Sequence, residues 1–186
     1  MLRPDGSCNH IAVFNPKTGE LIKTPGGQGY GENSSWARGQ AWALYGLALA
    51  YLHTNDQRYL DRAKQAAHYF IAQISVTGYV SLVDFRAPEE PVYWDTTAAA
   101  CGACGLLQLA ETVPELERGF YYENAYRILR VLEEKHCCWD YERDGILQNG
   151  TAAYGKMEET HVSLIYGDYF FVEGILRLMD KGFLIW

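Results

Sequence analysis

The feature that most constrains the fold of this chain is the recurrence of helical stretches rich in small residues. Three of them begin near Ser35, Thr96 and Ser163, at intervals of 61 and 67 residues. An amphipathic stretch with its apolar residues at helical spacing follows each of the first two. A repeat of this length, built from a small-residue helix and an amphipathic partner, is typical of a toroid of helical hairpins. The sequence therefore predicts an all-α fold that forms part of an (α/α)6 toroid, with two hairpins and one unpaired helix, or about half of the six-hairpin barrel.

Capping residues and apolar spacing set the expected bounds of the helices. Asn33 or Ser34 can cap the first helix and Asp95 the third, because side-chain oxygens of these residue types accept hydrogen bonds from the free amides of a first turn. The short break at 54–56 requires the first two helices to pack antiparallel. The expected helices cover 35–53, 59–74, 96–112, 120–136 and 163–181.

The first 34 residues differ from the rest in composition. They are rich in Gly, Pro and Asn, and one alternating segment from Ile11 to Ile22 is interrupted by the turn-forming residues 15–19, which predicts a two-stranded hairpin. With 186 residues and 48% hydrophobic content, one domain with a sizeable core is expected. We therefore expect a single partial toroid domain over 1–186, with loop and hairpin over 1–34 and helices over 35–186.

The charge of the chain limits its partners. A formal net charge of −7 argues against a nucleic-acid partner, which requires a basic face. It also repels an anionic substrate at long range, so recognition of an acidic ligand has to come from local groups. The sequence contains no run of about 18 apolar residues and no signal-peptide core at its start. We therefore expect no membrane partner.

The cysteines are interpreted as packing residues. They are Cys8, Cys101, Cys104, Cys137 and Cys138. Their odd number excludes a complete disulfide framework, which favours a reducing, cytoplasmic location. Cys101 and Cys104 have a metal-site spacing, but they lie in an Ala/Gly run where cysteine serves as a small apolar residue. No metal or other cofactor is expected.

Arg38 and Trp42 form the first candidate site. They lie one turn apart on the first expected helix. A guanidinium in the first turns of a helix, among Ala, Gly and Trp, favours an anion opposite it, and Trp42 offers a flat apolar face to the C–H face of a sugar ring. The pair indicates a site for an acidic carbohydrate. The alternative is that Arg38 pairs with a structural carboxylate and that Trp42 belongs to the core.

Two runs at the start of this helix form a longer motif. They are Gln28-Gly29-Tyr30 and, five residues later, Trp36-Ala37-Arg38-Gly39-Gln40-Ala41-Trp42, which continues into 44–51. The motif resembles that of the unsaturated glucuronyl hydrolases, glycoside hydrolase family 88. Further stretches similar to this family are His10 before 14–20, 95–100 and 167–173. The resemblance covers nearly the whole chain in the family's order, and it implies the C-terminal half of such an enzyme.

The resemblance also implies a reaction and a set of substrate contacts. The family hydrates the C4–C5 double bond of a 4,5-unsaturated uronate at the non-reducing end of a lyase product, without a cofactor. The substrate-binding positions that carry over are His10, Gln28, Arg38, Trp42, Tyr154 and Lys156. The family's acid/base aspartates lie upstream of the His10 position. We therefore expect no catalytic residue in this chain and an inactive fragment, whose partners are the unsaturated oligosaccharide and the missing N-terminal half.

Several points stay open at this stage. Tyr166 and Asn149 depart from the family pattern, in which Trp and His are commoner, and this leaves the preference for sugar substituents open. Lys156 either faces a sulfate or remains a solvated surface charge. Asp95 is interpreted as a helix cap, and four further aspartates as loop or structural residues; these are Asp84, Asp140, Asp144 and Asp168.

Two other functions fit the same sequence. One is a related unsaturated rhamnogalacturonyl hydrolase, which shares the toroid; the other is a non-catalytic carbohydrate-binding fragment. Whatever its function, half a toroid leaves inner helices without neighbours. We therefore expect the inner-helix faces at Ala98–Gly105 and Leu44–Tyr51 to be exposed.

Overall fold

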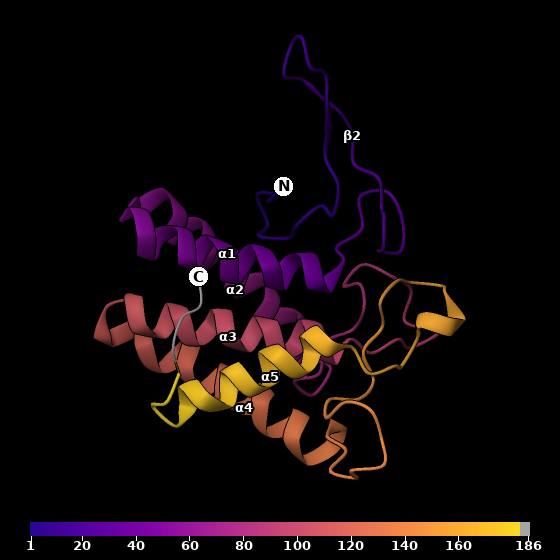
Figure 1. Ribbon diagram of the computed structural model, residues 1–186. Helices are drawn as coiled ribbons and strands as arrows, with labels where there is room; N and C mark the ends of the chain where they lie inside the picture. Colours follow the sequence, from indigo (N-terminus) through magenta and orange to yellow (C-terminus); the bar gives the residue numbers. More distant parts are fainter. Residues whose placement is uncertain (183–186) are drawn as a thin grey trace.

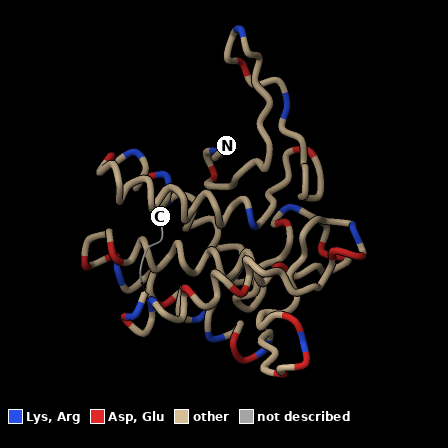
Figure 2. Tube along the Cα trace, viewed as in Figure 1, with Lys and Arg blue, Asp and Glu red and all other residues tan. Residues whose placement is uncertain are grey.

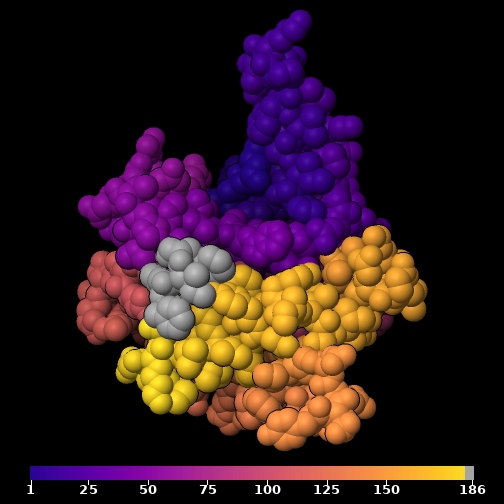
Figure 3. All heavy atoms as spheres, in the orientation of Figure 1, coloured from indigo at the N-terminus to yellow at the C-terminus, as the bar shows by residue number. Residues whose placement is uncertain are grey.

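The computed structural model describes residues 1–182, and these fold into a body of helices from which a hairpin projects (Figures 1 and 3). The helices are α1 (Ala37–Thr54), α2 (Gln57–Ser75), α3 (Thr96–Thr112), α4 (Glu115–His136) and α5 (Ile165–Leu178), with a short 3-10 helix η1 (Met157–Glu159). The hairpin pairs β1 (Val13–Phe14) antiparallel with β2 (Leu21–Lys23). The predictions of an all-α fold and of the hairpin are confirmed.

Helix α3 lies at the centre of the body and packs against α1, α4 and α5, while α2 packs on α1. The helices α1, α3 and α5 run in the same direction, so their N-terminal ends meet at the end of the body where the long loops lie (Figure 1). The helices α2 and α4 run back along the outside. This is the expected arrangement of parallel inner helices with antiparallel outer partners.

Small residues explain why α3 occupies the centre. A side chain at Gly102 would overlap the ring of Phe70, and one at Gly105 would come within 2.8 Å of Leu44. Every residue from Thr96 to Ala110 is buried. The expectation that Ala98–Gly105 is exposed is therefore wrong, because α1, α4 and α5 of the same chain enclose α3. The second stretch that was expected to be exposed, Leu44–Tyr51, agrees in part with the expectation. Leu44, Tyr45 and Ala48 are buried, whereas Gly46 is exposed and Leu47 is half-buried.

The bounds of α3 agree with the prediction, and the Asp95 side chain caps it by accepting a hydrogen bond from the Ala98 N–H. The predicted cap of the first helix is wrong. Helix α1 begins at Ala37 after Trp36, without a side-chain cap, because a backbone carbonyl from another loop accepts a hydrogen bond from its first turn. The Ala37 N–H donates to the Val83 carbonyl at 3.0 Å.

The other helix ends differ from the prediction by a few residues. Helix α4 begins at Glu115, where Glu115 and Glu117 favour the positive end of the helix dipole. Helix α5 is shorter than expected at both ends. Charged side chains lie mainly on the loops and outer helices, and α1 and α3 are almost free of them (Figure 2). Within residues 1–182, no helix is long and apolar enough to cross a lipid bilayer.

Candidate functional site

The N-terminal ends of the three parallel helices meet at a buried ion pair. Arg38 is the second residue of α1, and Asp95 is the N-cap of α3. The Arg38 guanidinium donates from Nε and Nη2 to Asp95 Oδ2 at 3.1 and 2.9 Å, and the two side chains are 1% and 0% exposed. The interpretation in which Arg38 pairs with a structural carboxylate is confirmed. Burial raises the pKa of Asp95 above its ordinary value, against the opposing effect of Arg38.

Two further groups hold the Arg38 guanidinium. Its Nη2 also donates to the Thr151 carbonyl at 2.5 Å, and Nη1 donates to the Tyr166 hydroxyl at 2.9 Å. The rings of Trp36 and Tyr166 lie on it, each with its centroid 5.1 Å from Cζ. The guanidinium is thus fixed by residues from α1, α3, α5 and the loop that precedes η1.

Trp36 connects Arg38 with two of the other expected site residues. Its buried ring lies 4.2 Å from the His10 ring and 5.3 Å from the Trp42 ring, measured between centroids. Trp42 itself is 48% exposed. The interpretation of Trp42 as a core residue is therefore wrong, since nearly half of its side chain faces solvent beside His10.

Backbone contacts join the first loop to the loop before η1. His10 Nδ1 lies between the Gln28 N–H at 3.1 Å and the Gly26 carbonyl at 3.0 Å. Gln28 donates from Nε2 to the Ala152 carbonyl at 2.8 Å, and the Gln28 carbonyl accepts from the Tyr154 N–H at 2.9 Å. Within residues 1–182, His10 Nε2 makes no hydrogen bond, so this nitrogen is available to a ligand.

An open groove of about 580 Å³ lies beside these residues. Its walls are the first ten residues of the chain and one face of α1. Its lining comprises Met1, Leu2, Cys8, Asn9, His10, Gly39, Trp42, Ala43, Gly46 and Leu47. The groove combines an aromatic face with an imidazole, which suits the apolar and polar faces of a sugar ring.

Tyr154 and Lys156 lie in the loop before η1, but only Tyr154 joins the cluster. The Tyr154 ring packs edge-on against Tyr30 and Tyr93, with centroids 5.0 and 5.2 Å away, and partial burial raises its pKa. Lys156 Nζ pairs with Glu159 Oε1 at 3.0 Å on the surface. The structure thus brings together His10, Gln28, Arg38, Trp42 and Tyr154, and it leaves Lys156 outside.

Sequence reasoning missed three contributors to this cluster. Trp36 was noted only as part of the motif, although its position directly before Ala37 and Arg38 was a usable signal. The Thr151 carbonyl and the Tyr166 hydroxyl are separated from Arg38 by 113 and 128 residues, and no local pattern indicates such contacts. Asp95 was identified as a cap, but its pairing with Arg38 was not.

Three of the four other aspartates discussed above accept hydrogen bonds from the backbone, and the fourth, Asp144, lies in an exposed bend. Asp84 accepts hydrogen bonds from the Tyr30, Ser35 and Arg86 N–H groups. Asp168 accepts from the N–H groups of Ile146 and Leu147, and Asp140 from that of Glu142. Their interpretation as structural or loop residues is confirmed.

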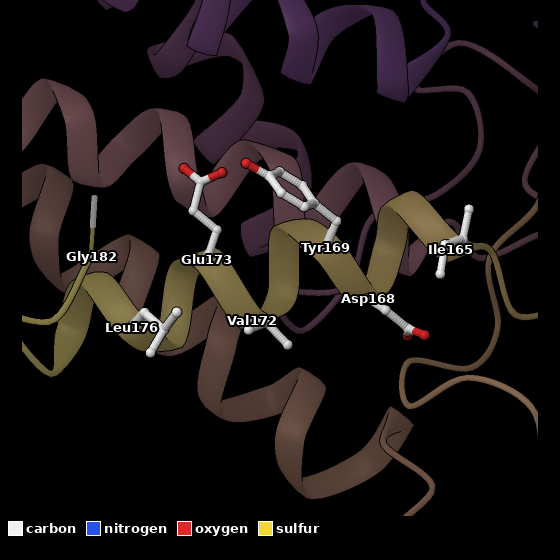
Figure 4. A pocket seen from close by; sticks show the side chains of 7 residues that line it. All are labelled: Ile165, Asp168, Tyr169, Val172, Glu173, Leu176 and Gly182. Carbon is white, nitrogen blue, oxygen red and sulfur yellow. The ribbon is translucent and has the colours of Figure 1, made fainter. Parts of the chain in front are cut away.

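A second cavity, of about 420 Å³, lies on α5 (Figure 4). Figure 4 shows Tyr169 and Glu173 pointing to one side of the helix and Val172 and Leu176 to the other. Glu173 is bound to the Tyr45 hydroxyl and to Arg177 Nε. None of the expected site residues lines this cavity.

The loop that supplies Thr151 is anchored by a histidine, and this makes the loop sensitive to acid. His136 Nδ1 accepts a hydrogen bond from the Asn149 side-chain amide at 3.0 Å. Burial lowers the pKa of His136 from 6.5, and Lys135 and His161 add to this effect. The folded chain therefore binds fewer protons than the unfolded chain. The contribution of His136 to stability is complete above pH 6.5 and is lost as the pH falls through the lower folded-state pKa.

We expect the melting temperature to fall between pH 7.5 and 5, and the fall to be smaller in His136→Gln, which keeps an acceptor but cannot be protonated. Thermal melts followed by circular dichroism measure this. His53→Gln, at an exposed histidine of α1, should keep the full fall. The pKa of His68 is also lowered by burial, so some fall persists in His136→Gln. Equal falls in the wild type and in His136→Gln would contradict the assignment.

Comparison with known proteins gives close relatives. No family model matches the chain. An unsaturated glucuronyl hydrolase of Bacillus sp. strain GL1 is 34% identical over 98% of this chain and 49% of its own length. The crystal structure of an unsaturated glucuronyl hydrolase from Bacillus sp. GL1, described as responsible for the degradation of glycosaminoglycan, is also similar. The match covers 95% of this chain and 48% of the chain in the crystal, with a TM-score of 0.87.

A second relative is known with a bound sugar. It is an Asp-to-Asn mutant of the Streptococcus agalactiae unsaturated glucuronyl hydrolase complexed with dGlcA-GalNAc6S. It is 30% identical in sequence, and the match covers 100% of this chain and 50% of the chain in the crystal, with a TM-score of 0.85. The chain thus spans about half the length of the relatives it matches, and its helices form part of the same toroid.

Proposed function

The chain belongs to the unsaturated glucuronyl hydrolase family and covers about half of such an enzyme; on this premise we propose that it supplies the sugar-binding part of a glycoside hydrolase. In this proposal, residues 1–186 act as one partial toroid domain. The five cysteines are free, which supports a reducing, cytoplasmic setting.

We propose that the groove beside α1 receives a 4,5-unsaturated uronate at the non-reducing end of an oligosaccharide. The observation that carries this is the half-exposed Trp42 beside His10, on a groove of about 580 Å³. Trp42 would contact the C–H face of the sugar ring, and His10 Nε2 and Gln28 would contact its polar groups. Tyr154 lies outside the groove, in a small cavity with Tyr93, and is tied to Gln28 through its backbone N–H. Lys156 would have to leave Glu159 to reach a substituent. The complex of the S. agalactiae relative with dGlcA-GalNAc6S supports this substrate class.

The proposed reaction needs a general acid, and three aspartates that could be considered for this role are already engaged by other groups. Hydration of the double bond places a proton on C4 and water on C5, after which the hemiketal opens and the glycosidic bond is lost. A general acid must reach the reacting carbon. Asp84, Asp95 and Asp168 are each engaged by backbone amides or Arg38. We therefore propose that the acid comes from the other half of the toroid, as a partner outside residues 1–186.

The test of this function is the affinity of the 186-residue chain for an unsaturated chondroitin disaccharide, measured by isothermal titration calorimetry. Trp42→Ala should weaken binding by about 1–2 kcal/mol, or roughly five- to thirty-fold, because the sugar loses its apolar face. Trp139→Ala is the matched control, since Trp139 is also an exposed tryptophan, at 61%, and lies outside the groove. Equal affinities of the two variants would refute the placement of the sugar on Trp42.

A further inference from the structure

We propose that the Tyr166 hydroxyl is the group that binds the carboxylate of the unsaturated sugar, so that Tyr166 determines the preference of the site for an acidic ligand. This inference rests on the function proposed above and assigns a residue to it. Arg38 would then act through Tyr166 and hold the hydroxyl in place.

Arg38 is poorly placed to bind an anion by itself. Its side chain is 1% exposed. A guanidinium has five N–H groups. Asp95 accepts a hydrogen bond from the N–H of Nε and from one N–H of Nη2. The Thr151 carbonyl accepts from the second N–H of Nη2, and the Tyr166 hydroxyl accepts from one N–H of Nη1. One N–H on Nη1 remains, directly beside the Tyr166 hydroxyl.

The Tyr166 hydroxyl has a proton to donate. Its oxygen accepts the hydrogen bond from Arg38 Nη1 at 2.9 Å, so its own proton points elsewhere. Within residues 1–182, no acceptor for that proton is found. A hydroxyl that accepts from a cation is polarised and becomes a stronger donor. Tyr166 is only partly buried, whereas Arg38 beneath it is almost fully buried.

The surroundings favour negative charge at this position. Tyr166 is the second residue of α5, and the N-terminal ends of α1 and α3 lie beside it, so three helix dipoles present their positive ends here. The charge of Asp95 is balanced by Arg38. Asp168, in the first turn of α5, is turned to the N–H groups of Ile146 and Leu147. A carboxylate would accept from the Tyr166 hydroxyl, which Arg38 Nη1 holds in place from the buried side.

The experiment compares an unsaturated chondroitin disaccharide with its methyl ester, which has the same shape but no carboxylate charge. Affinities of the 186-residue chain for both are measured by calorimetry at pH 7. The wild type should prefer the acid by about tenfold or more, the range of a hydrogen bond to a charged group. Tyr166→Phe keeps the ring on Arg38 and removes the hydroxyl. It should bind acid and ester with nearly equal affinity.

The ratio of the two affinities separates this role from a structural one, because a general disturbance of the site weakens acid and ester alike. Tyr122→Phe, at an exposed tyrosine of α4, should keep the wild-type ratio. If Tyr166→Phe keeps the wild-type preference for the acid, the inference is overturned while the proposed function stands. If the wild type binds neither ligand, the proposed function fails, and the assignment of Tyr166 fails with it.

Discussion

Replacing Asp95 with alanine is expected to lower the free energy of unfolding by about 3–5 kcal/mol, because it leaves the Arg38 charge buried without a partner. The two side chains are 1% and 0% exposed, so water cannot replace the lost carboxylate. The substitution also removes the cap of α3 at the Ala98 N–H. A domain of this size is stabilised by only about 5–15 kcal/mol. The loss is therefore a large part of the total.

Asp56→Ala provides the matched control for this prediction. Asp56 is also an N-cap that pairs with an arginine, but its partner Arg58 is exposed. Loss of this cap and of a surface ion pair should lower the free energy of unfolding by much less than the loss of the buried pair, because solvent screens the exposed charges. Urea unfolding followed by circular dichroism gives both values. Similar losses in Asp95→Ala and Asp56→Ala would show that the Arg38–Asp95 pair does not hold the three helix ends together.

The second large effect expected is the absence of turnover. Asp95 is the aspartate whose raised pKa resembles that of a general acid. Its geometry excludes this role, because it is fully buried beneath Arg38 and accepts hydrogen bonds from Arg38 and Ala98. A general acid must lie within hydrogen-bond reach of the atom that it protonates. The purified chain should therefore bind the unsaturated sugar and leave its double bond intact.

The fold was predictable to the extent that local signals determine it. The bounds of α3 follow from Asp95 and the small-residue run, and they agree with the structure. The start of α1 could not be predicted, because its first amide, that of Ala37, donates to the Val83 carbonyl, which is distant in sequence. The burial of Ala98–Gly105 was also missed. Sequence spacing shows that a helix face is apolar, but it does not show how many neighbours in the same chain cover that face.

In the candidate site, too, local sequence signals were predictable and contacts between distant residues were not. Trp42 and His10 were singled out from the motif, and the structure places both on one groove. The environment of Arg38 was only half predictable. A buried guanidinium requires a carboxylate, but the choice of Asp95, 57 residues away, depends on how α1 and α3 pack. The contact with Tyr166 depends in turn on the position of α5.

Sugar binding without turnover is tested most directly by a proton NMR titration of an unsaturated chondroitin disaccharide with the purified 186-residue chain. One experiment reports binding through the indole N–H signal of Trp42, assigned with Trp42→Phe, and turnover through the C4 proton on the sugar double bond. We expect the Trp42 signal to shift, the Trp139 signal to stay in place, and the C4 proton signal to keep its intensity. A C4 proton signal that decays, or a Trp42 signal that does not respond to the sugar, would contradict this expectation.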